Sequence, residues 1–129
     1  MNLIISPFRS ERSSLENWRK MKALRRIAID MGFEPMTVVG RFGGVTEYSM
    51  IIKAEPEDIR GWFVIASYGF QQDCILVVYK NFDSCLVFSD HYQWLGKFTK
   101  INFSDLKVGQ DYTQIGCETF VTVGTQHEC

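Results

Sequence analysis

Two amphipathic helical segments, separated by strand-like runs, limit the possible folds of this chain more than any other feature of its sequence. The first helical segment opens with a capping box at residues 13–16, with Ser13 as N-cap, and ends before Gly32. The second opens at Pro56 and ends at Gly69. The strand-like runs are residues 2–6, 36–42, 45–54, 74–80 and 84–89.

The order of these elements is strand, helix, strand, strand, helix, strand, strand. Its first six elements match the split βαβ arrangement, which predicts an α+β fold with a ferredoxin-like βαββαβ core. We expect a mixed or antiparallel sheet with two helices on one face. The 129 residues form a single domain in this interpretation, with a core at residues 1–90 and a C-terminal β extension at residues 91–129. The extension should contain strands near residues 97–103 and 119–123, and it either extends the sheet or covers its second face.

Charge is distributed unevenly along the chain, although the net charge is only −1. Residues 1–33 hold seven of the fourteen basic residues but only three of the fifteen acidic ones. Arg19, Lys22 and Arg26 form a basic stripe opposite the apolar face of the first helix. We expect a solvated helix surface here, and contact with nucleic acid or an acidic protein surface is the alternative.

The first residues lack the basic region and the long apolar run of a signal peptide or a membrane span. No close pair of ligands suggests a metal site, so neither a metal nor a cofactor is expected, and His91 and His127 are isolated. The cysteines lack C-x-x-C spacing, which favours reduced thiols in a cytoplasmic protein without membrane contact. These cysteines are Cys74, Cys85, Cys117 and Cys129.

A carboxylate and a hydroxyl occur together in the run 45–54, which forms a predicted hairpin with residues 36–42 through a glycine turn. Because side chains alternate along a strand, Glu47 and Ser49 share one face with Ile51, and Met50 lies on the face that packs against the helices. If the C-terminal extension covers the first face, the carboxylate is partly desolvated and needs a partner.

Several polar residues elsewhere could belong with this pair. Asn17 is an amide on the apolar face of the first helix, which suggests a specific hydrogen bond. The candidate binding cluster comprises Arg9, Asn17, Arg41, Glu47, Ser49 and Gln71. We favour a buried polar network that fixes strand register, and a ligand or catalytic site is the alternative. No catalytic residue is assigned, because no histidine is placed to activate Ser49.

These residues lie in a pattern of short motifs: Ser6-x-x-Arg9, Glu16-Asn17-x-x-Lys20, Gly40-x-x-Gly43-Gly44-x-x-Glu47-x-Ser49 and Ala66-x-x-Gly69-x-Gln71. The pattern resembles a family of small bacterial and phage proteins known only as a domain of unknown function, over roughly residues 4–80. The resemblance implies a compact α+β domain from bacteria or their mobile elements, in which Gln71 or Gln72 belongs to the polar signature. It implies no reaction.

The expected function is therefore binding. We expect a small cytosolic accessory protein, encoded by a phage or mobile element, that binds a host protein and inhibits a host defence system. The absence of a catalytic constellation, the segregated charge and the many aromatic residues favour a binding function, and the phage or mobile-element origin is what the resemblance implies. The alternative is a small enzyme or nucleotide-binding module in which Glu47 is a base or ligand anchor and Arg9 or Arg41 binds an anionic group. Nucleic acid is a further candidate partner through the basic helix, and the oligomeric state stays open.

Overall fold

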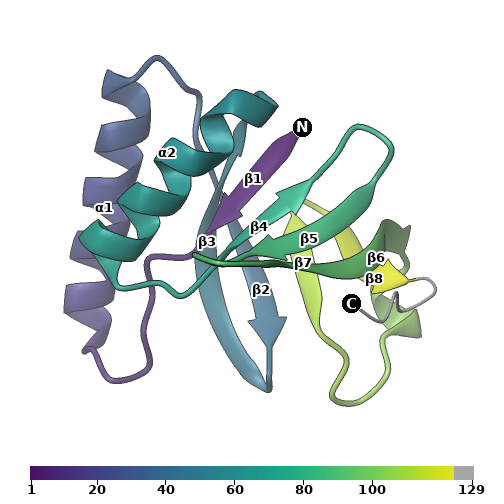
Figure 1. The fold of residues 1–129 in the computed structure, drawn as a ribbon. Helices are drawn as coiled ribbons and strands as arrows, with labels where there is room; N and C mark the ends of the chain where they lie inside the picture. Colours follow the sequence, from purple (N-terminus) through teal and green to yellow (C-terminus); the bar gives the residue numbers. More distant parts are fainter. Residues whose placement is uncertain (124–129) are drawn as a thin grey trace.

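The computed structural model describes residues 1–123, with the exception of the Phe42 side chain. Within these residues the chain forms eight strands, which are β1 (Asn2–Ile5), β2 (Met36–Phe42), β3 (Val45–Lys53), β4 (Ile75–Val78), β5 (Asp83–Val87), β6 (Tyr92–Ile101), β7 (Tyr112–Ile115) and β8 (Glu118–Val123). They pair in the order β1-β3-β2-β7-β8-β6-β5-β4, and β4 pairs with β1 to close a barrel (Figure 1). Every neighbouring pair is antiparallel.

The helices begin and end close to the predicted positions. In α1 (Ser14–Asp30), the Ser13 hydroxyl caps the helix by accepting a hydrogen bond from the Glu16 N–H at 3.2 Å. Gly32 follows the helix with a φ of +90°, in the left-handed region that favours glycine. The second helical segment consists of η1 (Pro56–Asp58), α2 (Ile59–Val64) and η2 (Ile65–Gly69). None of the helices formed by residues 1–123 is both long enough and apolar enough to cross a membrane.

The apolar residues form two cores, one on each side of the barrel wall. The outer core lies between the two helices and the outer faces of β1, β3, β4 and β5, which Figure 1 shows on the helical side of the barrel. Its largest fully buried side chain is Trp62 of α2. The inner core fills part of the barrel, and its buried members are Ile4, Val38, Ile51, Leu76, Val78 and Phe98. Strands β1 and β4, and residues 49–52 of β3, therefore bury both of their faces.

The expected ferredoxin-like sheet is wrong, because the sheet closes into a barrel. The apolar character of both faces of β4 suggested an interior strand of a layered α+β fold, but one face packs on the helices and the other lines the barrel. Residues 92–123 are not an extension added to a finished sheet. They form β6, β7 and β8, with η3 (Phe103–Asp105) between β6 and β7, and these strands complete the barrel wall.

Candidate functional site

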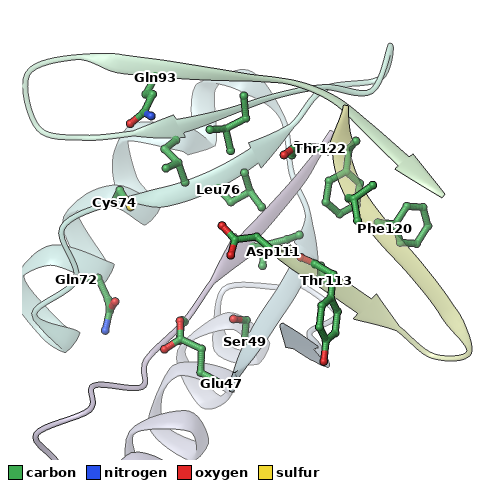
Figure 2. Close-up of a pocket in the computed structure, with 17 residues that line it drawn as sticks. Glu47, Ser49, Gln72, Cys74, Leu76, Gln93, Asp111, Thr113, Phe120 and Thr122 are labelled. Atoms are coloured by element: carbon green, nitrogen blue, oxygen red, sulfur yellow. The ribbon is translucent and has the colours of Figure 1, made fainter. Parts of the chain in front are cut away.

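A pocket of about 400 Å³ opens into the barrel interior (Figure 2). Its floor and walls include inner-core residues such as Ile4, Leu76 and Phe98. Its polar lining comes from four of the strands, β3, β6, β7 and β8, and from loops beside the strands. These polar residues include Ser6, Glu47, Ser49, Gln72, Cys74, Gln93, Asp111, Thr113 and Thr122.

Alternation along β3 places Glu47 and Ser49 in this pocket. Ile51, two residues further along, belongs to the inner core, and Met50 belongs to the outer core, so the predicted division of the two faces is confirmed. Ser49 is only 3% exposed. Glu47 pairs in register with Gly40 on β2, so the inward position beside the carboxylate carries no side chain.

The Glu47 carboxyl group is half-buried, and this burial raises its pKa above the ordinary value of 4.5. A hydrogen bond with the Ser6 hydroxyl acts in the opposite direction. The same hydroxyl lies 3.2 Å from the carbonyl oxygen of Tyr48, and its single proton can serve one acceptor at a time. Glu47 therefore keeps acceptor capacity for a donor or cation in the pocket.

Cys74 is the thiol that lines the pocket. Burial, together with the negative charges of Asp73 and Glu47, raises the pKa of Cys74 to about 11. A thiol with this pKa is almost entirely protonated at neutral pH. Cys74 is thus a poor nucleophile here.

The lining of the pocket is negatively charged. Of its 17 lining residues, all within the part of the chain that the structure describes, Glu47 and Asp111 are carboxylates and none is an arginine, lysine or histidine. Asp111 also accepts a hydrogen bond from the Gly43 N–H at 3.0 Å, which ties the β6–β7 connection to the β2–β3 turn. Such a pocket attracts a cationic ligand and repels an anionic one.

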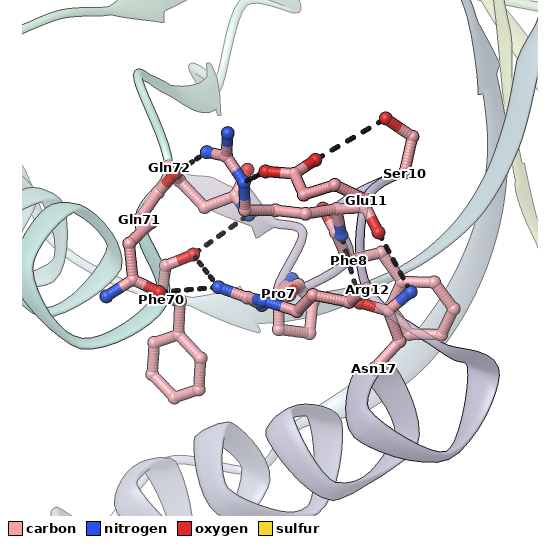
Figure 3. Close-up of polar contacts among 10 residues, drawn as sticks. Pro7, Phe8, Ser10, Glu11, Arg12, Asn17, Phe70, Gln71 and Gln72 are labelled. Carbon is pink, nitrogen blue, oxygen red and sulfur yellow. Dashed lines mark hydrogen bonds and ion pairs between the residues drawn. The ribbon is translucent and has the colours of Figure 1, made fainter.

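Three of the predicted cluster residues meet beside the pocket rather than in its lining (Figure 3). Asn17 is buried, accepts a hydrogen bond from the Arg9 N–H at 3.0 Å and donates one to the Arg9 carbonyl at 3.0 Å. The Arg9 guanidinium group donates to the backbone carbonyl of Gln71 and pairs with Glu11. These contacts join the loop after β1 to the loop after η2.

The structure does not bring Arg41 to Glu47. Arg41 pairs in register with Thr46 on β3, which is adjacent in sequence to Glu47 and so has the opposite orientation. Arg41 is exposed and lies on the outer face of the barrel, where it cannot balance the carboxylate in the pocket.

The basic stripe lies apart from the pocket, because Arg19, Lys22 and Arg26 are exposed on α1 and none of them lines it. Arg26 forms an ion pair with Asp30 at 3.1 Å. Partner binding at this surface stays a prediction.

Sequence reasoning missed several lining residues. Cys74, directly before β4, and Leu76 within it are two residues apart and share one face. Nothing in the sequence shows that this face lies opposite Glu47. Gln72 was considered only as an alternative to Gln71, and it is Gln72 that lines the pocket. Asp111 carries no local signal, because barrel closure brings it to the pocket from 64 positions beyond Glu47.

The chain matches the profile of the S-adenosylmethionine lyase family over residues 3–123. No curated protein matches it. The family is described by an activity, not as a domain of unknown function, and the match extends beyond the residues that carry the resemblance. It overturns the expected phage accessory protein that binds a host protein and inhibits host defence, and it favours the alternative of a small enzyme. The chain belongs to the S-adenosylmethionine lyase family.

Proposed function

We propose that this chain cleaves S-adenosylmethionine in the barrel pocket, by breaking a carbon–sulfur bond without adding water. The observation that carries the proposal is the charge of the pocket, which Glu47 and Asp111 line without a cationic residue among the 17 lining positions. The substrate carries a sulfonium and an ammonium group against one carboxylate, so its net charge is positive. The charges of pocket and substrate are therefore complementary.

The size and walls of the pocket suit the remainder of the substrate. The volume of about 400 Å³ lies within the range of roughly 300–1,000 Å³ that is typical of small-molecule sites. The Phe98 and Phe120 rings stack with centroids 4.9 Å apart, and both residues line the pocket. They provide an apolar surface for the adenine ring.

The absence of a cationic side chain from the 17 described lining residues also bears on the reaction. Without an arginine or lysine partner, the carboxylate of the substrate is free to attack its own γ-carbon. A carbon–oxygen bond forms, the bond between the γ-carbon and sulfur breaks, and the electron pair stays on sulfur. The products are a five-membered lactone and the neutral thioether 5′-methylthioadenosine, so the atoms balance without water or proton transfer.

The apolar walls of the pocket favour this step. A carboxylate and a sulfonium neutralise each other as the new bond forms, so the transition state is less charged than the bound substrate. Walls such as Leu76, Leu95 and Phe98 exclude water, which otherwise stabilises the separated charges. Glu47 would slow the reaction if it stabilised the sulfonium in the ground state, so we place it at the ammonium, whose charge does not change.

The protonated thiol of Cys74 takes no part as a nucleophile in this proposal. Arg41 holds no anionic group of the substrate, because it lies on the outer face. The proposal includes a cytoplasmic location, which the free thiols of Cys74, Cys85 and Cys117 support, whereas Cys129 and His127 lie outside the described residues.

The proposal is tested by incubating the purified protein with S-adenosylmethionine in ¹⁸O-labelled water and identifying the products by mass spectrometry. We expect 5′-methylthioadenosine and an unlabelled lactone, and any label that enters later by lactone hydrolysis should appear in the carboxyl group. Label in the side-chain hydroxyl of homoserine would mean that water attacks the γ-carbon and would contradict the lyase reaction. Intact S-adenosylmethionine after prolonged incubation would contradict the proposed function itself.

A further inference from the structure

We propose that the side-chain oxygen of Gln72 forms, with the Glu47 carboxylate, the site that binds the α-ammonium group of the substrate. Gln72 is then a specificity-determining residue that selects sulfonium compounds carrying a primary ammonium. The inference rests on the proposed function and assigns one end of the substrate to one side of the pocket.

The hydrogen bonds of Gln72 fix which end of its amide faces the pocket. Its Nε2 atom donates to the carbonyl oxygens of Phe8 and Phe70, each at 3.2 Å. Carbonyl oxygens only accept hydrogen bonds, so the amide cannot turn its oxygen toward them. The NH₂ group is thereby held by backbone, and the oxygen is the end of this side chain that remains for a ligand. Figure 2 shows Gln72 beside Glu47 and Ser49 along one side of the pocket.

One of these carbonyls, that of Phe70, is itself held in place by an arginine of the neighbouring loop (Figure 3). Arg12 donates to the carbonyl of Phe70 at 3.0 Å and to that of Pro7 at 2.8 Å, so it joins both loops. Gln71, between Phe70 and Gln72, has a φ of +53°, a left-handed conformation that is unusual for a glutamine. The loop thus turns sharply at Gln71, and Gln72 is held in the pocket lining.

An ammonium group fits this arrangement better than the other polar groups of the substrate. The Gln72 oxygen and an ionised Glu47 only accept hydrogen bonds, which excludes the substrate carboxylate from this side. The adenine amino group can donate but is neutral, whereas a half-buried carboxylate gains most from a positive charge. A primary ammonium supplies three donors and the charge together.

The test compares two substrates, S-adenosylmethionine and the analogue that carries hydrogen in place of the α-amino group. The preference is the ratio of their kcat/KM values, and 5′-methylthioadenosine release is the readout for both. Gln72→Met keeps the length of the side chain but removes donor and acceptor, and Gln72→Lys keeps donors for the two carbonyls but removes the acceptor. Gln114→Met, which makes the same exchange on β7 outside the pocket lining, is the matched control.

We expect the wild type to prefer S-adenosylmethionine and both Gln72 variants to lower the preference by roughly ten- to a hundredfold, the value of a hydrogen bond to a charged group. Gln114→Met should affect both substrates equally and keep the preference. A folded Gln72→Lys with the wild-type preference would overturn the inference and leave the lyase reaction intact. A wild type that cleaves neither compound would instead overturn the proposed function, and the inference with it.

Discussion

Replacement of Asn17 by alanine should lower the free energy of unfolding more than the substitution of a single polar residue usually does. Asn17 is 7% exposed, and its amide forms two hydrogen bonds of 3.0 Å with the backbone N–H and C=O of Arg9. Leaving two such groups without partners costs about 2.5–3.5 kcal/mol in total, which is less than for two fully buried groups because the Arg9 backbone is only partly buried. Alanine regains roughly 0.5 kcal/mol through its higher helix propensity. The expected net loss is about 2–3 kcal/mol.

The assay is urea unfolding followed by far-UV circular dichroism at neutral pH. With a slope of about 2 kcal/mol per molar urea, the midpoint should fall by roughly 1–1.5 M. Ser14→Ala, at an exposed position in the first turn of the same helix, is the control and should change the midpoint little. If the midpoint of Asn17→Ala falls no further than that of Ser14→Ala, the Asn17–Arg9 hydrogen bonds do not hold the loop after β1.

Three further predictions concern the pocket and the basic stripe. Burial raises the pKa of Glu47 above 4.5, so the folded state retains a proton that the unfolded state releases. The stability that Glu47 contributes therefore falls as pH rises through its folded pKa. Glu47→Gln should gain stability relative to the wild type as pH rises from 4.5 through that folded pKa, and a constant difference in urea midpoint would contradict this. Because the pKa of Cys74 is about 11, iodoacetamide at neutral pH should alkylate the exposed Cys117 well before Cys74. Equal labelling of the two cysteines in peptide mass spectrometry would show that Cys74 is not protected from alkylation. We propose that the basic stripe contacts nucleic acid. The double variant Lys22→Glu, Arg26→Glu should then bind a short DNA duplex more weakly at low salt, as measured by fluorescence anisotropy. An unchanged affinity would refute that contact.

The parts of the fold that depend on neighbouring residues could be predicted from the sequence. The Ser13 cap and the Gly32 termination of α1 follow from local chemistry, and the structure confirms both. The same is true of the hairpin through residues 43–44 and of the shared face of Glu47 and Ser49 away from the helices, because alternation along a strand needs no distant information.

Barrel closure could not be predicted in this way, because it depends on pairings between distant strands. A strand that is apolar on both faces fits a layered sheet covered by helices and a barrel equally well, and β4 was assigned to the first. The pairing of β2 with β7 joins residues more than 70 positions apart, and no local pattern in either strand specifies it.

The pocket could be predicted only in part for the same reason, because its lining residues come from distant strands and loops. Glu47 and Ser49 could be selected as a polar pair, but its lining also includes Gln72, and Asp111 comes from the β6–β7 connection. The binding function was predicted because no catalytic motif is visible in the sequence. A reaction in which the substrate supplies its own nucleophile needs no such motif, since the protein contributes charge, shape and exclusion of water.

The most direct test of the proposed role of this pocket is kcat/KM for S-adenosylmethionine cleavage by the wild type and by Glu47→Gln, with melting temperatures measured on the same samples. Glu57→Gln, which alters an exposed carboxylate of η1 outside the pocket, is the matched control. We predict that Glu47→Gln lowers kcat/KM by roughly ten- to a hundredfold without a loss of melting temperature, because it removes the charge that binds the ammonium and keeps the shape of the side chain. A Glu47→Gln enzyme as active as Glu57→Gln and the wild type would contradict the assignment of the barrel pocket as the site of cleavage.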